Sequence, residues 1–288
     1  MKLSKFLLLG LLGLCVPLTG CSDDEKDPAN DPASEEVPHH PTSNFDRCPL
    51  LAHIDNPKLG IKEITLERYE DGELAYKEVY SYDKEQRLTK ITGISEGSNY
   101  KEECEYDTKG RPVKYLVTND AGDMETHTFI YDEYGFLVRL KESSVYGGDS
   151  EESEMVFSYL GDTLFLAEIW ENDTALSKVL YSEDLYPLYF GAVSGTEFIY
   201  EWKDGNLVAE KHKWSWEEEW YTRKWEYDAN VSIEHLTTYC QYMWFVENAG
   251  SMSTNNSLGH WSYTYDDKGM VTTRQHGVSK NVYTYIYY

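Results

Sequence analysis

The stretch KWSWEEEWYTRKWEYD at residues 213–228 carries side chains that could bind a ligand. It holds four of the eight tryptophans in the chain, together with three consecutive glutamates. In an extended segment, residues two apart point to the same face. The residues that would share a face in this way are Trp214, Trp216, Glu218 and Trp220. Flat rings beside carboxylates suit sugar rings, so these four form a candidate ligand or glycan platform, although tryptophans also fill the cores of aromatic-rich sheets.

One short motif resembles a catalytic nucleophile. The segment GISEG at residues 93–97 matches G-x-S-x-G, but that motif requires a strand, a turn and a helix in succession. Its surroundings have the alternation of strands and loops, which predicts a connection between two strands. The histidines are scattered, without the spacing of a triad or a zinc protease. We therefore assign no catalytic residue and expect a protein that is not an enzyme.

Three other groups could bind metal or form disulfides. His39 and His40 lie in a polar stretch, and GGDSEESEM at residues 147–155 gathers four carboxylates. The carboxylates lack the ordered spacing of a calcium loop, which favours a solvated hairpin tip. The cysteines beyond residue 21 are Cys48, Cys104 and Cys240, and they form no CxxC pair. We expect no metal and no cofactor.

A Tyr-Asp pair recurs along the chain. The clear copies are YSYDKEQRL (80–88), CEYDTKGRPV (104–113), FIYDEYGFLV (129–138) and YTYDDKGMV (263–271). Weaker copies are FSYLGDTLF (157–165), FIYEWKDGNLV (198–208) and WEYDANVSI (225–233). The residue two before the tyrosine is aromatic in every copy except one, where it is Cys104. This position predicts that Cys104 is buried.

Each copy is typical of a strand, a tight turn and a second strand. The aspartate would accept hydrogen bonds from turn amides, and a glycine three residues later would supply a positive φ. The repeat is therefore structural. The residues predicted to form the turns are Tyr82, Asp83, Tyr106, Asp107, Gly110, Tyr131, Asp132, Gly135, Tyr265, Asp266 and Gly269.

Residues 59–288 show two-residue alternation and almost no helical periodicity. Aromatic residues alternate with charged residues and threonine, which predicts one packed and one solvated face. The fold class predicted for this single domain is all-β. We expect an antiparallel meander of repeated hairpins, curled into a barrel-like or strongly twisted single sheet.

The first 58 residues predict the cellular location of the protein. Lys2 and Lys5 precede a short apolar run, and the segment LTGC that follows resembles a bacterial lipobox. This resemblance implies a signal peptide at residues 1–20, cleavage before Cys21 and acylation of Cys21. Residues 21–58 are acidic and proline-containing, which predicts a flexible tether. The membrane would then be contacted through the N-terminal acyl anchor.

The N-terminus and the repeat together resemble known bacterial proteins. The run CSDDEK resembles the export signal of surface lipoproteins in Bacteroidetes-type bacteria, and the repeat resembles the YD repeats of bacterial surface and toxin-shell proteins. The chain is similar to a group of Bacteroidetes-type lipoproteins of unknown function with a porin-like or β-meander domain. This resemblance implies a lipid anchor in the outer membrane, displayed on the cell surface or on the periplasmic face. A membrane-spanning barrel would also show alternation, but an acyl anchor would be redundant for it.

The formal net charge of −25 restricts the partners. Phosphate backbones require a basic footprint, so nucleic acid is excluded as a partner. The partners left open are a glycan or a protein of the envelope. We therefore expect a non-catalytic binding or adhesion module, and the alternative is a structural or assembly lipoprotein of the envelope without a small-molecule ligand.

Overall fold

In the computed structural model, the residues described are 44–51, 57–95, 97–170, 173–237, 252–259 and 261–288. The strands are β1 (Ile61–Glu70), β2 (Glu73–Tyr82), β3 (Leu88–Ser95), β4 (Ser98–Tyr106), β5 (Pro112–Asn119), β6 (Met124–Tyr131), β7 (Leu137–Tyr146), β8 (Asp149–Leu160), β9 (Thr163–Trp170), β10 (Asp173–Tyr181), β11 (Pro187–Ala192), β12 (Glu197–Lys203), β13 (Asn206–Lys213), β14 (Tyr221–Lys224), β15 (Tyr227–Val231), β16 (Asn255–Ser257), β17 (Ser262–Tyr265), β18 (Val271–His276) and β19 (Ser279–Tyr287). The helices are a 3-10 turn, η2 (Pro49–Leu51), and α2 (Ile233–Thr237).

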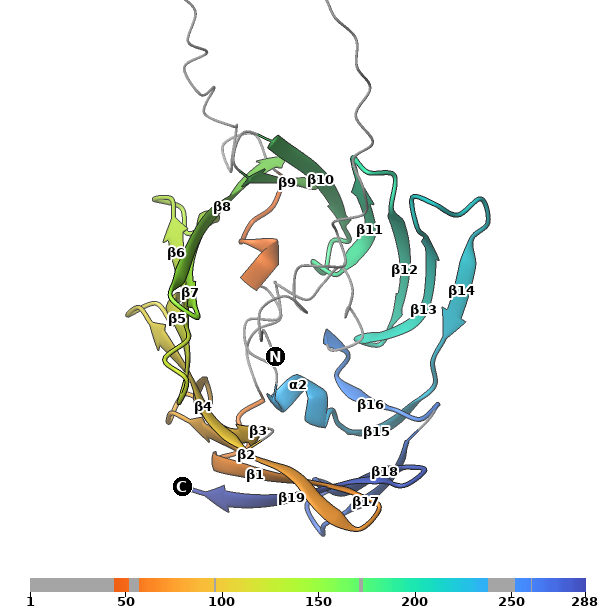
Figure 1. The fold of residues 1–288 in the computed structure, drawn as a ribbon. Helices are drawn as coiled ribbons and strands as arrows, with labels where there is room; N and C mark the ends of the chain where they lie inside the picture. The colour runs from red at the N-terminus through yellow and green to blue at the C-terminus, as the bar shows by residue number, and fades with distance from the viewer. Residues whose placement is uncertain (1–43, 52–56, 96, 171–172, 238–251, 260) are drawn as a thin grey trace, which may run out of the picture. The chain divides into compact units, whose positions relative to one another are not determined.

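Within these residues, seventeen strands form one antiparallel sheet. Strands β1 to β14 pair in chain order (Figure 1). Strand β1 also pairs with β19, which continues through β18 to β17. No pair of described strands joins β14 to β17, so the sheet is not closed into a barrel. The predicted class, an all-β antiparallel meander of hairpins, is confirmed.

A bulge in β1 shows how the sheet handles an irregular hydrophobic pattern. Ile61 has the opposite parity to Ile64 and Leu66, yet all three are buried. The pairing of β1 with β19 shifts between Ile61 and Glu63. An extra residue on one strand reverses the faces beyond it, so the bulge brings all three side chains to the core.

Two apolar clusters pack on the sheet. One cluster joins residues of β6 to β13 with the segment around η2, and it centres on fully buried side chains such as Leu137, Leu140 and Tyr159. The other joins β1 to β4, β18 and β19 with α2, and includes Ile64 and Leu236. The two helices therefore serve as covers for the sheet.

The sheet face opposite these clusters is charged. Lys77 pairs with Glu67 across two strands at 2.9 Å, and Arg139 pairs with Glu154 at 3.4 Å. These groups alternate with the buried side chains along the strands. The pattern agrees with the expected division into a packed and a solvated face.

The folded part begins earlier than the sequence predicts. Residues 44–51 belong to the stretch expected to be a tether, yet Phe45, Cys48 and Leu50 are buried in the first cluster. The ring of Phe45 makes edge contacts with Tyr159 and Tyr181 at centroid distances of 6.2 and 5.8 Å. Three apolar side chains are sufficient to dock this polar segment, which corrects the predicted boundary at residue 59.

A small insertion connects the two ends of the meander. Strands β15 and β16 pair with each other and enclose α2 between them in the chain. On one side, the amide of Thr254 donates to the carbonyl of Gly205 at 3.1 Å, before β13. On the other side, the hydroxyl of Tyr265 in β17 donates to Asp228. The insertion therefore contacts both ends of the open meander, in place of a β14–β17 strand pair.

Candidate functional site

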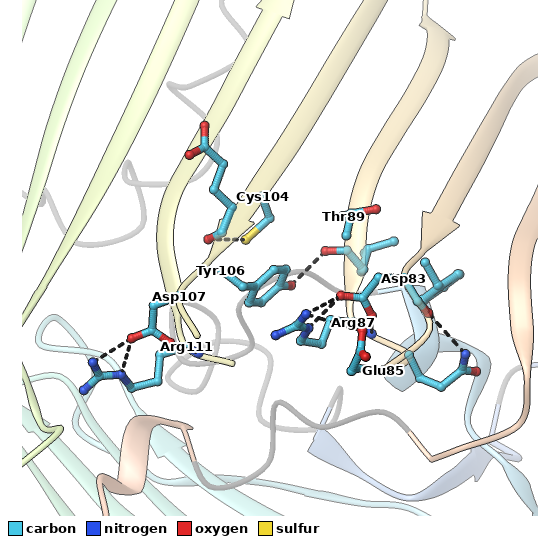
Figure 2. A network of polar contacts seen from close by, with 12 residues as sticks. Asp83, Glu85, Arg87, Thr89, Cys104, Tyr106, Asp107 and Arg111 are labelled. Carbon is cyan, nitrogen blue, oxygen red and sulfur yellow. Dashed lines mark hydrogen bonds and ion pairs between the residues drawn. The ribbon is translucent and has the colours of Figure 1, made fainter. Parts of the chain in front are cut away.

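The Tyr-Asp turns have the geometry that the repeat predicts. In the second copy, Oδ1 of Asp107 accepts hydrogen bonds from the amides of Lys109 and Arg111, both at 2.9 Å. Oδ2 accepts from the Arg111 guanidinium at 2.8 and 2.6 Å (Figure 2). Gly110 has a φ of 83°. The aspartate carboxylate is thus used within its own turn.

The first copy lacks the glycine. Gln86 occupies the left-handed position with a φ of 70°. Its side chain accepts from the amide of Ile61 at 2.8 Å and donates to the carbonyl of Ile61 at 3.1 Å. These bonds satisfy the first residue of β1 and offset the cost of a positive φ at a non-glycine residue.

In the second and third copies, the tyrosine contacts the preceding copy. The hydroxyl of Tyr106 donates to the carbonyl of Leu88 at 2.8 Å (Figure 2), and that of Tyr131 donates to the carbonyl of Pro112 at 2.7 Å. Each acceptor lies five residues after the aspartate of the earlier copy. The same relation holds for Tyr285, whose hydroxyl donates to Val271 at 2.7 Å. These bonds set the spacing between successive hairpins.

In the first three copies, the residue four positions after the aspartate packs on the tyrosine that reaches back to that copy. The guanidinium of Arg87 lies 4.8 Å from the ring centroid of Tyr106, and that of Arg111 lies 4.3 Å from the Tyr131 ring. In the third copy Phe136 fills this position, with its centroid 4.9 Å from that of Tyr159. Cationic and aromatic side chains thus serve as equivalents, since both pack well on a ring.

The structure reveals one copy that the sequence missed. Ser182 replaces the aspartate, its amide donates to the carbonyl of Tyr186 at 2.9 Å, and its Oγ accepts from the Tyr186 amide at 3.1 Å. Leu185 takes the glycine position with a φ of 63°. Tyr186 stacks on Trp202, whose indole donates to Pro187 at 2.7 Å. Trp202 therefore replaces the repeat tyrosine.

The weaker copies are not turns of this kind. Strands β8 and β9 are joined by two residues, and the pair at 200–201 lies within β12. The pair at 227–228 lies in β15, where Asp228 accepts from the amide of Asn256 at 3.1 Å. The predicted turn is therefore absent from these three segments, although Tyr159 and Tyr227 still donate to the carbonyls of Leu137 and Leu207 at 2.8 and 2.7 Å. The clear copies and the Ser182 turn show that the repeat is architectural.

The connections of the meander alternate between two rims. We call the rim with the turns at 83–87, 107–111, 132–136, 182–186 and 266–270 the Tyr-Asp rim, and the other the loop rim. The amide of Asn44 donates to Gly161 at 2.6 Å, and the amide of Tyr288 to Gly60 at 2.9 Å. Both bonds lie at the Tyr-Asp rim. The N-terminal segment therefore reaches the domain at the rim opposite the tryptophan-rich loop.

The tryptophan-rich stretch is a loop rather than a strand. Residues 214–220 connect β13 to β14 at the loop rim. The amide of Glu217 donates to the carbonyl of Trp214 at 2.9 Å, and the Glu217 carboxylate accepts from the Trp214 amide at 3.3 Å. This turn removes the two-residue alternation that an extended segment would have. The four predicted residues are neighbours in this loop but do not share a strand face.

Two of the tryptophans form a parallel stack. The rings of Trp214 and Trp216 lie 5.4 Å apart between centroids, with 7° between their planes. Trp214 is half-buried against Phe198, while Trp216 is 66% exposed. Trp220 is 40% exposed, and Glu218 is exposed. Trp214 thus agrees with the alternative that these tryptophans pack on the core of the sheet, whereas Trp216 presents a flat ring to solvent.

A buried histidine supports this stack from below. His212 lies 5.9 Å from Trp214 and stacks on Tyr221 at 5.6 Å with a 16° angle. Its Nδ1 lies 3.2 Å from Glu210, a carboxylate whose pKa is raised by burial. Packing on two sides fixes the Trp214 ring, which pre-organises the exposed ring above it.

A second polar cluster lies on the core-facing side of β2 to β8, and the sequence analysis missed it. The hydroxyl of Tyr115 donates to Glu102 at 2.6 Å, and that of Tyr146 to Glu125 at 2.6 Å. His127 lies 2.6 Å from Glu125 and 3.2 Å from a carboxylate oxygen of Glu142. Tyrosines and glutamates at alternate positions of successive strands were the signal available in the sequence.

The titration of this cluster follows from its burial. Burial raises the pKa of Glu102 to about 7, assisted by the nearby charges of Glu78 and Glu125 and opposed by the Tyr115 hydrogen bond. Burial acts to lower the pKa of His127, but its bonds to Glu125 and Glu142 outweigh this and raise it to about 9. The hydroxyls of Tyr115 and Tyr146 each donate to a glutamate, which supplies part of the hydrogen bonding that a buried polar network requires.

The remaining sequence candidates fall at strand connections. Residues 93–95 of the GISEG segment end β3, and Gly97 belongs to the turn before β4, so no helix follows. The acidic residues 149–154 lie within β8 and alternate between its faces. Among the described residues, no group of three or more His, Cys, Asp or Glu is placed to hold a metal ion. The described part of the chain also contains no helix long and apolar enough to cross a bilayer.

Two of the predicted cysteines lie among the described residues and two lie outside them. Cys48 and Cys104 are buried, and burial raises the pKa of the Cys48 thiol. The prediction that Cys104 occupies a core position is confirmed. Cys21, Cys240 and the pair His39-His40 lie outside the described residues.

Comparison with known proteins gives only distant likenesses. No protein-family model and no curated protein sequence matches the chain. A porin-like protein from Bacteroides uniformis ATCC 8492 matches with a TM-score of 0.39 and 16% identity, over 80% of this chain and 99% of the other. A porin-like protein from Bacteroides vulgatus ATCC 8482 matches with a TM-score of 0.28 and 14% identity, over 69% and 98%. The TcdB2-TccC3-Cdc42 structure matches with a TM-score of 0.28 and 12% identity, over 70% of this chain and 12% of the other.

Proposed function

We propose that the chain is a lipid-anchored protein of the outer membrane, displayed on the cell surface, whose domain binds glycans without catalysis. The anchor is Cys21, supported by the lipobox-like segment before it. The observation that carries the binding function is the Trp214–Trp216 stack, in which the exposed Trp216 ring packs on the half-buried Trp214 ring. Exposed flat rings bind sugars by stacking on their apolar C–H faces.

The two rims support this arrangement. The segment that follows the tether docks at the Tyr-Asp rim, through Asn44 and Gly161. The tryptophan loop at 214–220 lies at the loop rim, at the other ends of the strands. A protein anchored through its N-terminus would thus carry its binding loop on the side away from the docked segment.

Glycan-array binding of the full chain tests the function. Trp216→Ala should reduce binding about fivefold, because one stacked ring contributes roughly 1 kcal/mol. Tyr134→Ala is the matched control, since Tyr134 is 56% exposed but lies on the Tyr-Asp rim. Equal binding by both variants would reject the platform. If the unaltered chain binds no glycan, the structural or assembly alternative is favoured.

The anchor is tested separately. Cys21→Ser should release the protein from the membrane fraction and abolish incorporation of labelled palmitate. The Cys48→Ser variant is the control for labelling of other thiols. Because Cys48 is buried and should not be labelled, this variant should incorporate as much palmitate as the unaltered chain. Retention of the Cys21→Ser protein in the membrane would reject acylation as the anchor.

A further inference from the structure

Three lysines gather on the charged face of the β13–β14 hairpin. Lys211 pairs in register with Thr222, and Lys224 lies on the same face as Thr222, two residues along β14. Lys213 is two residues from Lys211, so it shares this face. The opposite face of β13 carries the buried His212. We call the set Lys211, Lys213 and Lys224 the lysine face.

The lysine face lacks the ion pairs that two other lysines on this face of the sheet form. Lys77 and Lys101, on the same sheet face, pair with glutamates at 2.9 and 2.7 Å. Among the described residues, no ion pair forms at the three lysines of the lysine face. Glu197 is opposite Lys213 in the register but accepts a hydrogen bond from Tyr189 at 2.6 Å instead.

The position of the hairpin explains the missing partners. Strand β14 is an end of the meander, and the part of the chain described shows no strand paired beyond it. Each residue of β14 is exposed. A neighbouring strand would normally supply cross-strand carboxylates, so here a charged ligand can take their place.

An exposed aromatic residue lies close to the lysines in the sequence. Trp220 directly precedes β14, two residues before Thr222 and four before Lys224. It is 40% exposed. A ring for stacking, a hydroxyl and three ammonium groups match a sugar that carries carboxylate or sulfate groups, since ammonium groups bind such anions by charge-assisted hydrogen bonds.

We propose that the lysine face, with Trp220, makes this protein select anionic glycans, carboxylated or sulfated, over neutral ones. This inference rests on the proposed glycan-binding function and names the ligand class of the same hairpin. The net charge of −25 does not oppose it. Charges beyond about 8 Å are largely screened at physiological ionic strength, so distant acidic residues contribute little to the potential at this hairpin.

The experiment measures binding of the full chain to immobilised polygalacturonate, dextran sulfate, polyglutamate and neutral dextran across a salt series. The test variant is Lys211→Gln/Lys213→Gln/Lys224→Gln. Its matched control removes three lysines of other strands, in the variant Lys62→Gln/Lys90→Gln/Lys114→Gln. Both variants change the net charge equally. Thermal unfolding of each variant checks that the fold is retained.

The expected result is binding of one or both anionic polymers that weakens as salt rises. The lysine-face variant should bind about tenfold more weakly, from three contacts of roughly 0.5 kcal/mol each. The control variant should bind like the unaltered chain. Binding to neutral dextran should be weaker than to the anionic polymers and equal for all three proteins.

Four outcomes would overturn the inference. The first is an equal loss of binding in the test and control variants, since net charge alone would then be responsible. The second is equally tight binding of polyglutamate, which carries carboxylates without sugar rings. Binding of neutral glycans that depends on Trp216, without preference for anionic ones, would reject this inference and leave the proposed function standing. Absence of any glycan binding would reject both.

Discussion

At the scale of single residues, the tyrosine and the aspartate of the repeat have separate tasks. Asp107 organises its own turn through two backbone amides and a guanidinium. Tyr131 reaches back to the carbonyl of Pro112 in the hairpin before it. The aspartate thus fixes a local conformation, and the tyrosine fixes the position of one hairpin relative to another.

Tyr131→Phe tests this division of tasks. The change removes a 2.7 Å hydrogen bond to Pro112 and leaves the packing against Arg111 in place. We expect the free energy of unfolding to fall by about 1 kcal/mol, measured by urea denaturation. Tyr134→Phe, at an exposed ring in the same turn, is the control. Equal effects of the two changes would contradict the role of the tyrosine hydroxyl.

Glu102 makes stability depend on pH. Its folded-state pKa of about 7 exceeds the value of an unfolded glutamate, so the unfolded state loses this proton first as the pH rises. The contribution of Glu102 to the stability of the unaltered chain should therefore fall between about pH 4.3 and pH 7. Glu102→Gln should remove this loss and stabilise the protein at pH 8 by about 1 to 3 kcal/mol.

Chemical denaturation of both proteins at pH 4 and pH 8 measures this difference. The glutamine can still accept a hydrogen bond from Tyr115, so the comparison isolates the charge. Glu103→Gln, on the opposite face of the same strand, is the control. A variant of Glu102 that is less stable at pH 8 than the unaltered chain would contradict the argument.

At the scale of elements, short segments outside the hairpins complete the apolar clusters. Helix α2 places Ile233 and Leu236 on the cluster of β1 to β4. The segment at 44–51 places Phe45 and Leu50 on the cluster of β6 to β13. A one-layer sheet needs such covers, because each apolar face must be packed against a second layer.

Phe45→Ala measures the contribution of the N-terminal cover. Phe45 is buried between two tyrosine rings, so its truncation should cost about 3 kcal/mol. Asp46→Ala, at the exposed neighbouring position, should change stability by less than about 0.5 kcal/mol. The measurement is the free energy of unfolding in urea. If both variants are as stable as the unaltered chain, residues 44–51 behave as part of the tether.

The elements also show what sequence reasoning could reach. The alternation and the Tyr-Asp pairs predicted the meander and its turns, since each turn uses only residues within six positions. Ser182 and Leu185 escaped notice because tertiary contacts of Tyr186 and Trp202 hold that turn without aspartate or glycine. Trp214 was placed on a strand because a turn closed by a glutamate side chain has no simple pattern.

At the scale of the whole molecule, the insertion of β15, α2 and β16 links strands from the two ends of the meander. Its contacts include Thr254 with Gly205 on one side and Asp228 with Tyr265 on the other. Asp228 also accepts from Asn256 within the insertion. Contacts between segments so distant along the chain carry no local signature, which is why the sequence did not reveal the insertion.

Asp228→Ala should weaken this link at one end. We expect faster amide hydrogen exchange in β17, because Tyr265 loses its acceptor, while β5 and β6 should be unaffected. Hydrogen exchange read by mass spectrometry measures both regions. Asp204→Ala, in the turn before β13, is the control for loss of a carboxylate near the insertion. Unchanged exchange in β17 would contradict the linking role.

The pairing of β1 with β19 also constrains how the molecule is made. The register runs from Ile61 opposite Tyr287 to Glu70 opposite Ser279. Strand β1 therefore waits for β19, and only the hairpins between them can form from local contacts. Because such distant pairing slows folding, the complete sheet can assemble only after β19 has been synthesised. Loss of β19 would leave one edge of β1 without its partner.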